Sequence, residues 1–321
     1  MIAFGPVPSR RLGRSLGINN IPPKICSYAC VYCQLGRTIK MQAHRRSFFR
    51  PEEILHDVRD KVEKSRRAGE SIDYLTFVPD GEPTLDLGLE RTIDLLRPLG
   101  IPIAVITNSS LLWDEEVRAA LLKTDWVSLK ADAAREEIWR KIDRPHGSLR
   151  LSAIRDGMRR FADAYAGRLV TETMLVAGVN DGATDLEETA EMIAQLSPSV
   201  AYLAVPTRPP AEAWVRPPKE ETLNRAFHII GGKVKNDDGS PAAEFLIGYE
   251  GNAFAFTGDV EQDLLSITAV HPMREDAVSE FLDRAGSDWE VIRRLVSEGT
   301  LVEAEYGGRR FFLRTLKPGG A

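Results

Sequence analysis

Two patterns of apolar and polar positions alternate along the first two thirds of the chain. Short apolar runs are each followed by a longer stretch in which apolar residues recur with helical spacing. The predicted strands are 15–21, 73–78, 101–108, 125–130, 168–176 and 200–205, and the predicted helices are 51–69, 87–100, 114–124, 148–165 and 183–196. Strands that alternate with helices indicate a parallel sheet with right-handed crossovers.

Several predicted strands are apolar almost throughout, as expected for parallel strands that helices cover. The helix over 51–69 has typical end signals: Pro51, Glu52 and Glu53 stand in its first turn, and basic residues precede Gly69. The sequence therefore predicts an α/β fold, a partial (β/α)6 barrel of the TIM type. An open doubly wound sheet is the main alternative.

The pattern changes after the last predicted strand. The segment 207–221 is rich in proline, which marks a connection that leaves the barrel, and 243–259 has no clear helical pattern. Beyond it, two helical stretches precede a hairpin around Gly307 and Gly308. The predicted domains are a barrel over residues 1–235, a connecting segment over 236–260 and a small winged-helix-like domain over 261–321.

Composition excludes some classes of protein. A chain of 321 residues with 43% hydrophobic and 28% charged residues is typical of a globular protein of about two domains. The net charge of −5 argues against a general nucleic-acid coat, which needs a basic surface. We find neither an apolar run long enough for a bilayer nor the pattern of a secretion signal, so we expect a cytoplasmic protein.

All three cysteines lie within eight consecutive positions, as Cys26, Cys30 and Cys33. A reducing cytoplasm disfavours a disulfide. A structural zinc site needs four ligands, and the nearest histidine, His44, lies eleven residues beyond the last cysteine. An iron–sulfur cluster fits better, because thiolates are its usual ligands. Three cysteines on a [4Fe–4S] cluster leave one iron open to a substrate or cofactor; zinc with a distant ligand and a metal-free loop are the alternatives.

The run CSYACVYC, residues 26–33, resembles the C-x3-C-x-aromatic-C signature of the radical S-adenosylmethionine (radical SAM) superfamily. The resemblance implies that Cys26, Cys30 and Cys33 are the catalytic, metal-binding residues, which hold a [4Fe–4S] cluster whose open iron binds SAM. It places Tyr32 near the adenine of SAM. It also implies reductive cleavage of SAM to a 5′-deoxyadenosyl radical that abstracts hydrogen from a substrate. A flavodoxin or ferredoxin is the implied electron donor.

The stretch VPDGEPTLD, residues 78–86, follows the second predicted strand. A glycine turn at the end of a strand lets the backbone approach a ligand. Gly81, Glu82 and Pro83 match the superfamily's GGEP motif, which implies that they hold the SAM amino group, although Asp80 replaces the first glycine. A Gly-Glu-Pro sequence alone favours an ordinary surface turn; the functional interpretation depends on its place after the second strand and behind the cysteine loop.

Polar residues also end the third and fourth predicted strands. Asn108 and Ser109 stand where the superfamily often binds the SAM ribose, but either residue also suits a helix N-cap. Ser128 and Lys130 point to one side if the strand continues. Lys130 is expected either to contact the SAM carboxylate or a substrate anion, or to form a rim ion pair with Asp132.

Other candidate contacts lie in later loops. Val176 and Gly178 belong to a stretch that resembles the one packing on adenine in the superfamily. Arg144 and His146 lie in a predicted loop, and Thr207 and Arg208 end the sixth strand, where we expect substrate to enter a six-unit barrel. Basic residues at positions 10, 11, 14, 37, 40, 44, 45, 46 and 50 can bracket an anionic substrate, guide an acidic flavodoxin, or simply form a solvated basic face.

A narrower resemblance covers nearly the whole chain, including the opening FGPVPSRRLGRSLGIN and the later LIGYEGNAFAFTGD. It is to radical SAM proteins related to wyosine-base formation on tRNA. Enzymes that build the tricyclic base use further cysteines for a second cluster, and this sequence has none left. An RNA base or a small anionic metabolite is therefore the expected class of substrate.

The winged-helix-like pattern of the last 61 residues raises the question of nucleic-acid binding. Residues 261–321 carry eight Arg and Lys against eleven Asp and Glu, which opposes binding to phosphates. Arg293, Arg294, Arg309 and Arg310 still allow a local basic patch. The main alternative is thus an iron–sulfur redox sensor whose winged helix binds nucleic acid, and a zinc-stabilised binding module is a third hypothesis.

Overall fold

The computed structural model describes residues 2–236, 238–247 and 251–315, and its centre is a curved sheet of eight strands. In spatial order the strands are β1 (Ala3–Ser9), β2 (Gly13–Ile18), β5 (Tyr74–Phe77), β6 (Ile103–Thr107), β7 (Trp126–Lys130), β8 (Arg168–Met174), β9 (Val200–Ala204) and β10 (Ala243–Leu246). β1 is antiparallel to β2, and every other neighbouring pair is parallel.

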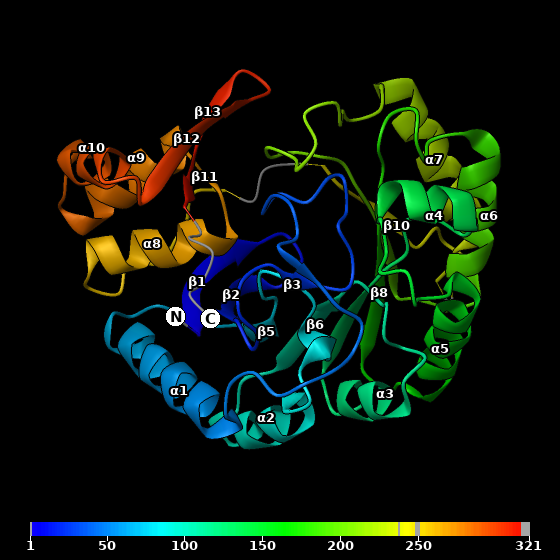
Figure 1. Cartoon of the computed structure of the whole chain (residues 1–321), viewed down its shortest axis with the longest axis horizontal. Helices are drawn as coiled ribbons and strands as arrows, with labels where there is room; N and C mark the ends of the chain where they lie inside the picture. Colours follow the sequence, from blue (N-terminus) through cyan, green and yellow to red (C-terminus); the bar gives the residue numbers. More distant parts are fainter. Residues whose placement is uncertain (1, 237, 248–250, 316–321) are drawn as a thin grey trace.

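Helices cover the outer face of this sheet (Figure 1). They are α1 (Pro51–Arg67), α2 (Leu89–Leu96), α3 (Glu115–Leu121), α4 (Glu136–Ile142), α5 (Leu151–Ala164), α6 (Ala183–Ala194) and α7 (Glu220–Lys233), with short 3-10 turns at Pro83–Leu85 and Arg97–Leu99. α1 shows why they pack there, because its buried Ile54, Val58 and Val62 recur with helical spacing and join the main core. In the part of the chain that is described, no helix is long and apolar enough to cross a membrane.

The strands curve around the interior with the helices outside, which is the arrangement of a partial barrel rather than of a doubly wound sheet (Figure 1). All six predicted strands are present, as β2 and β5 to β9. β1 was not predicted, because its Pro6 and Pro8 cannot donate ladder hydrogen bonds and so disguise an edge strand. α4, which precedes the predicted helix over 148–165, was not predicted either.

The sheet continues into the segment that the sequence assigns to a connection. β10 pairs in parallel with β9 through four residue pairs, from Ala243 beside Ala201 to Leu246 beside Ala204. β10 therefore adds a seventh parallel strand to the sheet beyond residue 235, and α7, which was not predicted, completes the sixth β/α unit before it. The strand is only four residues long, so its periodicity is too weak to detect in the sequence.

The chain ends in a compact group of elements that we call the C-terminal unit, residues 260–314. It comprises α8 (Val260–Val270), β11 (Met273–Arg274), α9 (Glu275–Ala285), α10 (Trp289–Ser297), β12 (Leu301–Tyr306) and β13 (Arg309–Arg314). The predicted two helices and hairpin are present, and Gly307 and Gly308, with φ of 57° and 70°, form the tight turn. α8 was not predicted.

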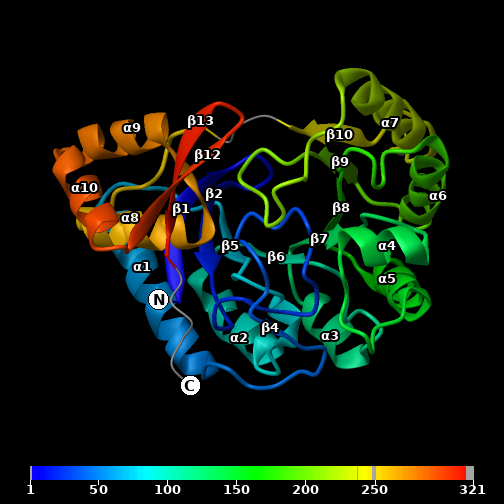
Figure 2. The ribbon, with the colours of Figure 1, turned by 45° about the horizontal axis from the view of Figure 1, so that its top comes forward.

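The C-terminal unit packs against β1 at the edge of the barrel (Figures 1 and 2). Phe4 and Val7 of β1 share one apolar cluster with Leu264 and Ile267 of α8. A buried ion pair between Lys61 Nζ of α1 and Asp263 Oδ1 of α8, 2.7 Å apart, adds a second connection. The unit thus closes the side of the barrel next to β1.

Candidate cofactor site

The three cysteines lie in the loop that follows the C-terminal end of β2. Within this loop β3 (Ile25–Cys26) pairs with β4 (Lys40–Met41), which folds the loop back on itself. Backbone hydrogen bonds tie it to the segment after α4: Val31 N donates to Ile142 O at 2.9 Å, and His146 N donates to Ser27 O at 2.9 Å. The fold therefore fixes the path of the cysteine loop.

All three cysteine side chains line one cavity of about 290 Å³ at this end of the barrel. The predicted site residues that line it are Cys26, Cys30, Tyr32, Cys33, Gly81, Glu82, Asn108, Lys130, Thr207 and Arg208. They come from the cysteine loop and from the segments that end β5, β6, β7 and β9. The structure thus brings together residues that are more than 180 positions apart in the sequence.

Glu82 is a buried carboxylate, with 1% of its surface exposed. Its Oε1 accepts hydrogen bonds from Thr84 Oγ1 and Thr107 Oγ1, both at 2.6 Å, and its Oε2 accepts one from Asn108 N at 2.7 Å. Burial raises the pKa of Glu82, although these hydrogen bonds to the ionised form oppose the rise. All these donors are neutral, so a cationic ligand in the cavity would stabilise the charge.

Gly81 allows the motif to touch the cysteine loop. A Cβ atom at this position would lie 1.8 Å from the carbonyl oxygen of Ile25, a distance that no side chain tolerates. The next residue, Glu82, donates its backbone N–H to the same oxygen at 3.2 Å. Pro83 begins the 3-10 turn behind the motif and does not line the cavity.

Asp80, which replaces the first glycine of the motif, is also buried. Its carbonyl oxygen accepts a hydrogen bond from Lys24 N at 2.6 Å, so its backbone supports the start of the cysteine loop. Burial raises the pKa of its carboxyl group to about 7, although Lys24 and Arg314 oppose the shift. The departure from the motif therefore leaves its loop contact in place.

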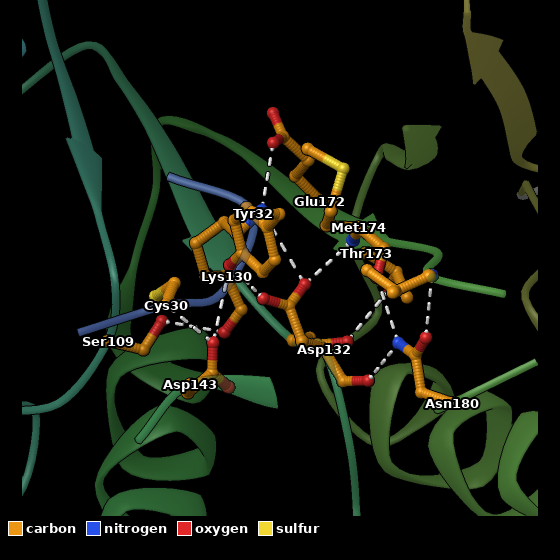
Figure 3. A network of polar contacts seen from close by, with 12 residues as sticks. Cys30, Tyr32, Ser109, Lys130, Asp132, Asp143, Glu172, Thr173, Met174 and Asn180 are labelled. Carbon is orange, nitrogen blue, oxygen red and sulfur yellow. Dashed lines mark hydrogen bonds and ion pairs between the residues drawn. The ribbon is translucent and has the colours of Figure 1, made fainter. Parts of the chain in front are cut away.

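A network of buried polar groups surrounds Lys130 (Figure 3). Lys130 Nζ lies 3.0 Å from Glu172 Oε1 and 3.5 Å from Asp132 Oδ1, and 4.8 Å from the centre of the Tyr32 ring. Burial alone would lower the pKa of Lys130, but Asp132 and Glu172 outweigh it and raise the pKa. The ion pair of Lys130 with Asp132, one of the two predicted alternatives, is present. Glu172, which was not predicted as a partner, lies closer to Lys130.

The same network reaches the cysteine loop through Tyr32. The Tyr32 hydroxyl donates to Asp132 Oδ2 and lies 3.3 Å from Asp143 Oδ1. The Cys30 thiol also lies 3.3 Å from Asp143 Oδ1. Burial, followed by the charge of Asp132, raises the pKa of Asp143 well above its usual range. Figure 3 shows these side chains converging beside Lys130, so the orientation of Tyr32 is fixed by two carboxyl groups.

Asn108 contacts the cysteine loop directly. Its Nδ2 donates to Ser27 Oγ at 2.9 Å and lies 3.5 Å from Cys26 Sγ. Ser109 turns away from the main cavity, and its hydroxyl donates to Lys130 O at 3.0 Å, which ties the ends of β6 and β7 together. Ser128 is completely buried within β7 and does not line the cavity.

The two residues predicted beside adenine do not line the cavity either. Val176 is buried in a small apolar cluster with Val31 and Val215, against which Tyr32 packs. Gly178 has a φ of 70° and forms a turn in which its N–H donates to Asp181 Oδ1 at 2.8 Å. Their stretch therefore supports Tyr32 from behind rather than facing the cavity.

Arg144 and His146 lie outside the cavity, at the surface. Arg144 Nη1 donates to Glu212 Oε1 at 2.6 Å, and His146 Nδ1 lies 2.8 Å from Ser148 Oγ. Their segment supplies the backbone groups that anchor the cysteine loop. Thr207 and Arg208 do line the cavity, as the position after β9 predicted.

Glu172 and Met174 of β8 line the cavity and were not singled out. Their spacing of two residues places both on one face of the strand. A signal was available in the sequence, because Glu172 is the charged residue in the apolar run LVTETMLV and needs a buried partner.

The chemistry of the three cysteines fits an iron–sulfur cluster. All three are free thiols, and burial raises the pKa of Cys26 to about 12, so a metal is needed to hold them as thiolates. Among residues 2–236, 238–247 and 251–315, no group of three or more His, Cys, Asp and Glu side chains is arranged to hold a single metal ion.

The chain is similar to known proteins in sequence and in fold. The family profile of the radical SAM superfamily matches residues 20–193. A UPF0026 protein of Methanocaldococcus jannaschii is 47% identical over 316 residues, which cover 98% of this chain and 97% of that protein.

Two solved structures share the fold at low sequence identity. A radical SAM methyltransferase from Sphaerobacter thermophilus is 18% identical with a TM-score of 0.57, over 73% of this chain and 66% of its own. TYW1 with a lysine-pyruvate adduct bound is 15% identical with a TM-score of 0.51, over 70% of this chain and 78% of its own. By its family profile and its relative in M. jannaschii, the chain belongs to the radical SAM superfamily and, within it, to the UPF0026 family.

Proposed function

We propose that this radical SAM enzyme binds one [4Fe–4S] cluster through Cys26, Cys30 and Cys33 and uses SAM to abstract hydrogen from its substrate. The observation that carries the proposal is that all three thiols share one cavity with the Gly81-Glu82 turn. Family membership implies both the cluster and SAM. When bound, the cluster supplies the electron that cleaves SAM reductively to the 5′-deoxyadenosyl radical.

The surrounding residues bind and orient SAM in this proposal. Glu82, buried among neutral donors, stabilises the SAM ammonium. Lys130 faces the SAM carboxylate, and Tyr32, held by Asp132, lies against the adenine. Asn108 holds the cysteine loop near Cys26 and contributes a polar group for the ribose.

An anaerobic assay tests this function. The cluster is reconstituted, reduced with dithionite and mixed with SAM, and 5′-deoxyadenosine and methionine are quantified. We expect both products from the wild type and none from Cys30→Ala, whose fold is checked by circular dichroism. A wild type that carries four irons yet forms no 5′-deoxyadenosine, with an EPR signal that SAM leaves unchanged, would falsify the proposal.

A low-potential flavodoxin or ferredoxin is the electron donor that this chemistry needs. Exposed basic residues in the cysteine loop and in the segment that follows it, including Arg37, Lys40 and Arg50, support an acidic donor. Their replacement by glutamine would lower the rate with reduced flavodoxin but not the rate with dithionite. A variant that keeps the wild-type rate with reduced flavodoxin would exclude this surface.

The substrate class is an RNA base or a small anionic metabolite. The resemblance of the opening segment FGPVPSRRLGRSLGIN to wyosine-related radical SAM proteins supports an RNA base. Addition of tRNA, or of small carboxylates and phosphates, to the cleavage assay separates the two classes. The true substrate would accelerate formation of 5′-deoxyadenosine and disappear in equal amount.

A second candidate function is an iron–sulfur sensor that binds DNA, and the C-terminal unit favours it. Its order of helices and hairpin resembles that of a winged helix, which supports this candidate. Its charge opposes this role, because eight basic and eleven acidic residues give about −3 over residues 261–321. Binding of a random DNA duplex that changes with the cluster's oxidation state, without SAM cleavage, would support the sensor.

A further inference from the structure

We propose that Arg10, Arg11 and Arg208 form a binding site for an anionic group of the substrate, a carboxylate or a phosphate, inside the barrel. This inference rests on the proposed function, because it places the substrate beside the cofactor cavity. It narrows the substrate class to molecules with such a group.

The three arginines stand where two cavities join. A second cavity, of about 130 Å³, lies between β1, the sheet and the C-terminal unit. It shares Arg10, Arg11, Gln34, Val78, Ile106, Arg208 and Leu246 with the cofactor cavity. A substrate group bound by these arginines would therefore lie next to the space proposed for SAM, as hydrogen abstraction requires.

The arginines reach this junction from two parts of the fold. Arg10 and Arg11 belong to the turn between β1 and β2, and Arg208 follows β9. Arg11 Nη1 donates to Glu172 Oε2, and its guanidinium lies 5.9 Å from the centre of the Trp126 ring. Arg10 Nη1 donates to the carbonyl oxygen of Leu246. The surrounding structure therefore sets the positions of these side chains in advance.

Arg208 is buried, with 7% of its surface exposed, and two polar groups orient it. Its Nη1 donates to Gln34 Oε1 at 2.6 Å, and its Nη2 lies 2.6 Å from His271 Nε2. Because a guanidinium can only donate, this His271 nitrogen accepts and carries no proton. A planar guanidinium held in this way suits the paired oxygens of a carboxylate or phosphate.

The local potential also favours an anion. Burial would raise the pKa of Glu172, yet the charges of Arg11 and Lys130, with a smaller contribution from Arg10, lower it to about 2. The positive groups therefore outweigh desolvation at this depth. Glu172 offsets part of the charge of Arg11 and Lys130, so a second anion at the junction depends mainly on the donors of Arg10 and Arg208.

The remaining wall limits the shape of the substrate. Phe4, Val7 and Leu12 line the second cavity, and the hydroxyls of Ser15 and Thr76, 2.6 Å apart, bond to each other there. The part of the substrate next to its anionic group is therefore small and largely apolar. His271 contributes to this wall, so the C-terminal unit helps to form the substrate chamber.

Calorimetric titration of the reconstituted enzyme tests the anion site without any turnover. Sodium phosphate and sodium succinate, each at constant ionic strength, are titrated into the wild type, Arg208→Gln and the control Arg159→Gln. Arg159 is half exposed on α5 and pairs with Asp156. We expect one of the two anions to bind, and Arg208→Gln to weaken it about tenfold or more while the control does not change.

The positioning role of His271 has its own variants. His271→Ala should weaken anion binding less than Arg208→Gln does, and His271→Gln, which restores an acceptor, should recover most of it. A purely structural role predicts no such rescue. Absence of phosphate and succinate binding in the wild type, or equal binding in wild type and Arg208→Gln, would overturn the inference.

Formation of 5′-deoxyadenosine by the wild type, measured in the same preparation, keeps the two proposals separable. If cleavage occurs without anion binding, only the anion site fails. If anions bind without cleavage, the site exists but the proposed function fails. The preferred anion also identifies the substrate group, because phosphate binding without succinate binding indicates a phosphoryl group.

Discussion

The two sides of the barrel interior are built by different means. At the cysteine loop, motif residues contact one another through the backbone, as Gly81 does with Ile25. At β1, the barrel is closed by side chains that carry no motif, such as Phe4 against α8 and Lys61 paired with Asp263. The structure at the cysteine loop depends on positions where only one residue type fits. The contact of β1 with the C-terminal unit depends on buried area and charge pairing, which many sequences can supply.

The largest effect is expected at the cysteine loop. Gly81→Ala would force a Cβ against the Ile25 carbonyl and displace the loop, since backbone cannot move aside as a side chain can. We expect the iron bound after reconstitution to fall about tenfold, measured by iron and sulfide analysis.

The matched control is Gly147→Ala, where a Cβ meets nothing within 4 Å. It should bind iron as the wild type does. A Gly81→Ala variant with normal iron content would show that the loop tolerates displacement, and the contrast between the two sides would disappear.

On the β1 side, Phe4→Ala should mainly lower stability. Phe4 is buried to 2% exposure and packs with the C-terminal unit, so its truncation costs about 3–5 kcal/mol of the free energy of unfolding. Urea titration measures this loss, and limited proteolysis should show the C-terminal unit released first. Retention of a single transition with unchanged midpoint would mean that β1 does not hold the unit.

Lys61→Met tests the charge pairing on the same side. It leaves Asp263 buried without its cation, and we expect a loss of about 3 kcal/mol in the free energy of unfolding. Thr257 also bonds to Asp263, which moderates the loss. The double variant Lys61→Met, Asp263→Leu should recover most of the stability; if it is less stable than either single variant, the pair is not the source.

The smallest effect is expected at the turn of the C-terminal hairpin, whose Gly307 and Gly308 line neither cavity. Gly308 has a φ of 70°, so Gly308→Ala strains the backbone by about 1 kcal/mol. Iron content and anion binding should not change, because the turn contacts neither cavity. A change in either property would indicate that the hairpin has a role at the site.

The sequence predicted the cofactor side better than the β1 side for a physical reason. Cys26, Glu82 and Asn108 lie in the segments that follow β2, β5 and β6, and the parallel order of these strands brings the segments together at one end of the barrel. The contacts of Phe4 depend on β1, an edge strand hidden by prolines, and on α8. No local pattern links segments about 260 residues apart.

Within the site, a position at the end of a strand predicted which residues line the cavity only where the strand end itself was located correctly. Lys130 and Arg208 line the cavity as expected, whereas Ser128 is buried within its strand. Val176 packs in the apolar cluster behind Tyr32 and Gly178 lies in the turn beyond it, because β8 ends at Met174 and the chain then turns away. The exact residue at which a strand ends decided these outcomes, and sequence patterns locate strand ends only to within a few residues.

One side chain connects the two sides of the interior. Arg208 bonds Gln34, which directly follows Cys33, and His271, which ends α8. We therefore expect the position of the cysteine loop and the docking of the C-terminal unit to be thermodynamically coupled. Coupling of this kind is reciprocal, so a ligand that orders the loop tightens the docking of the unit by the same free energy that docking adds to ligand binding.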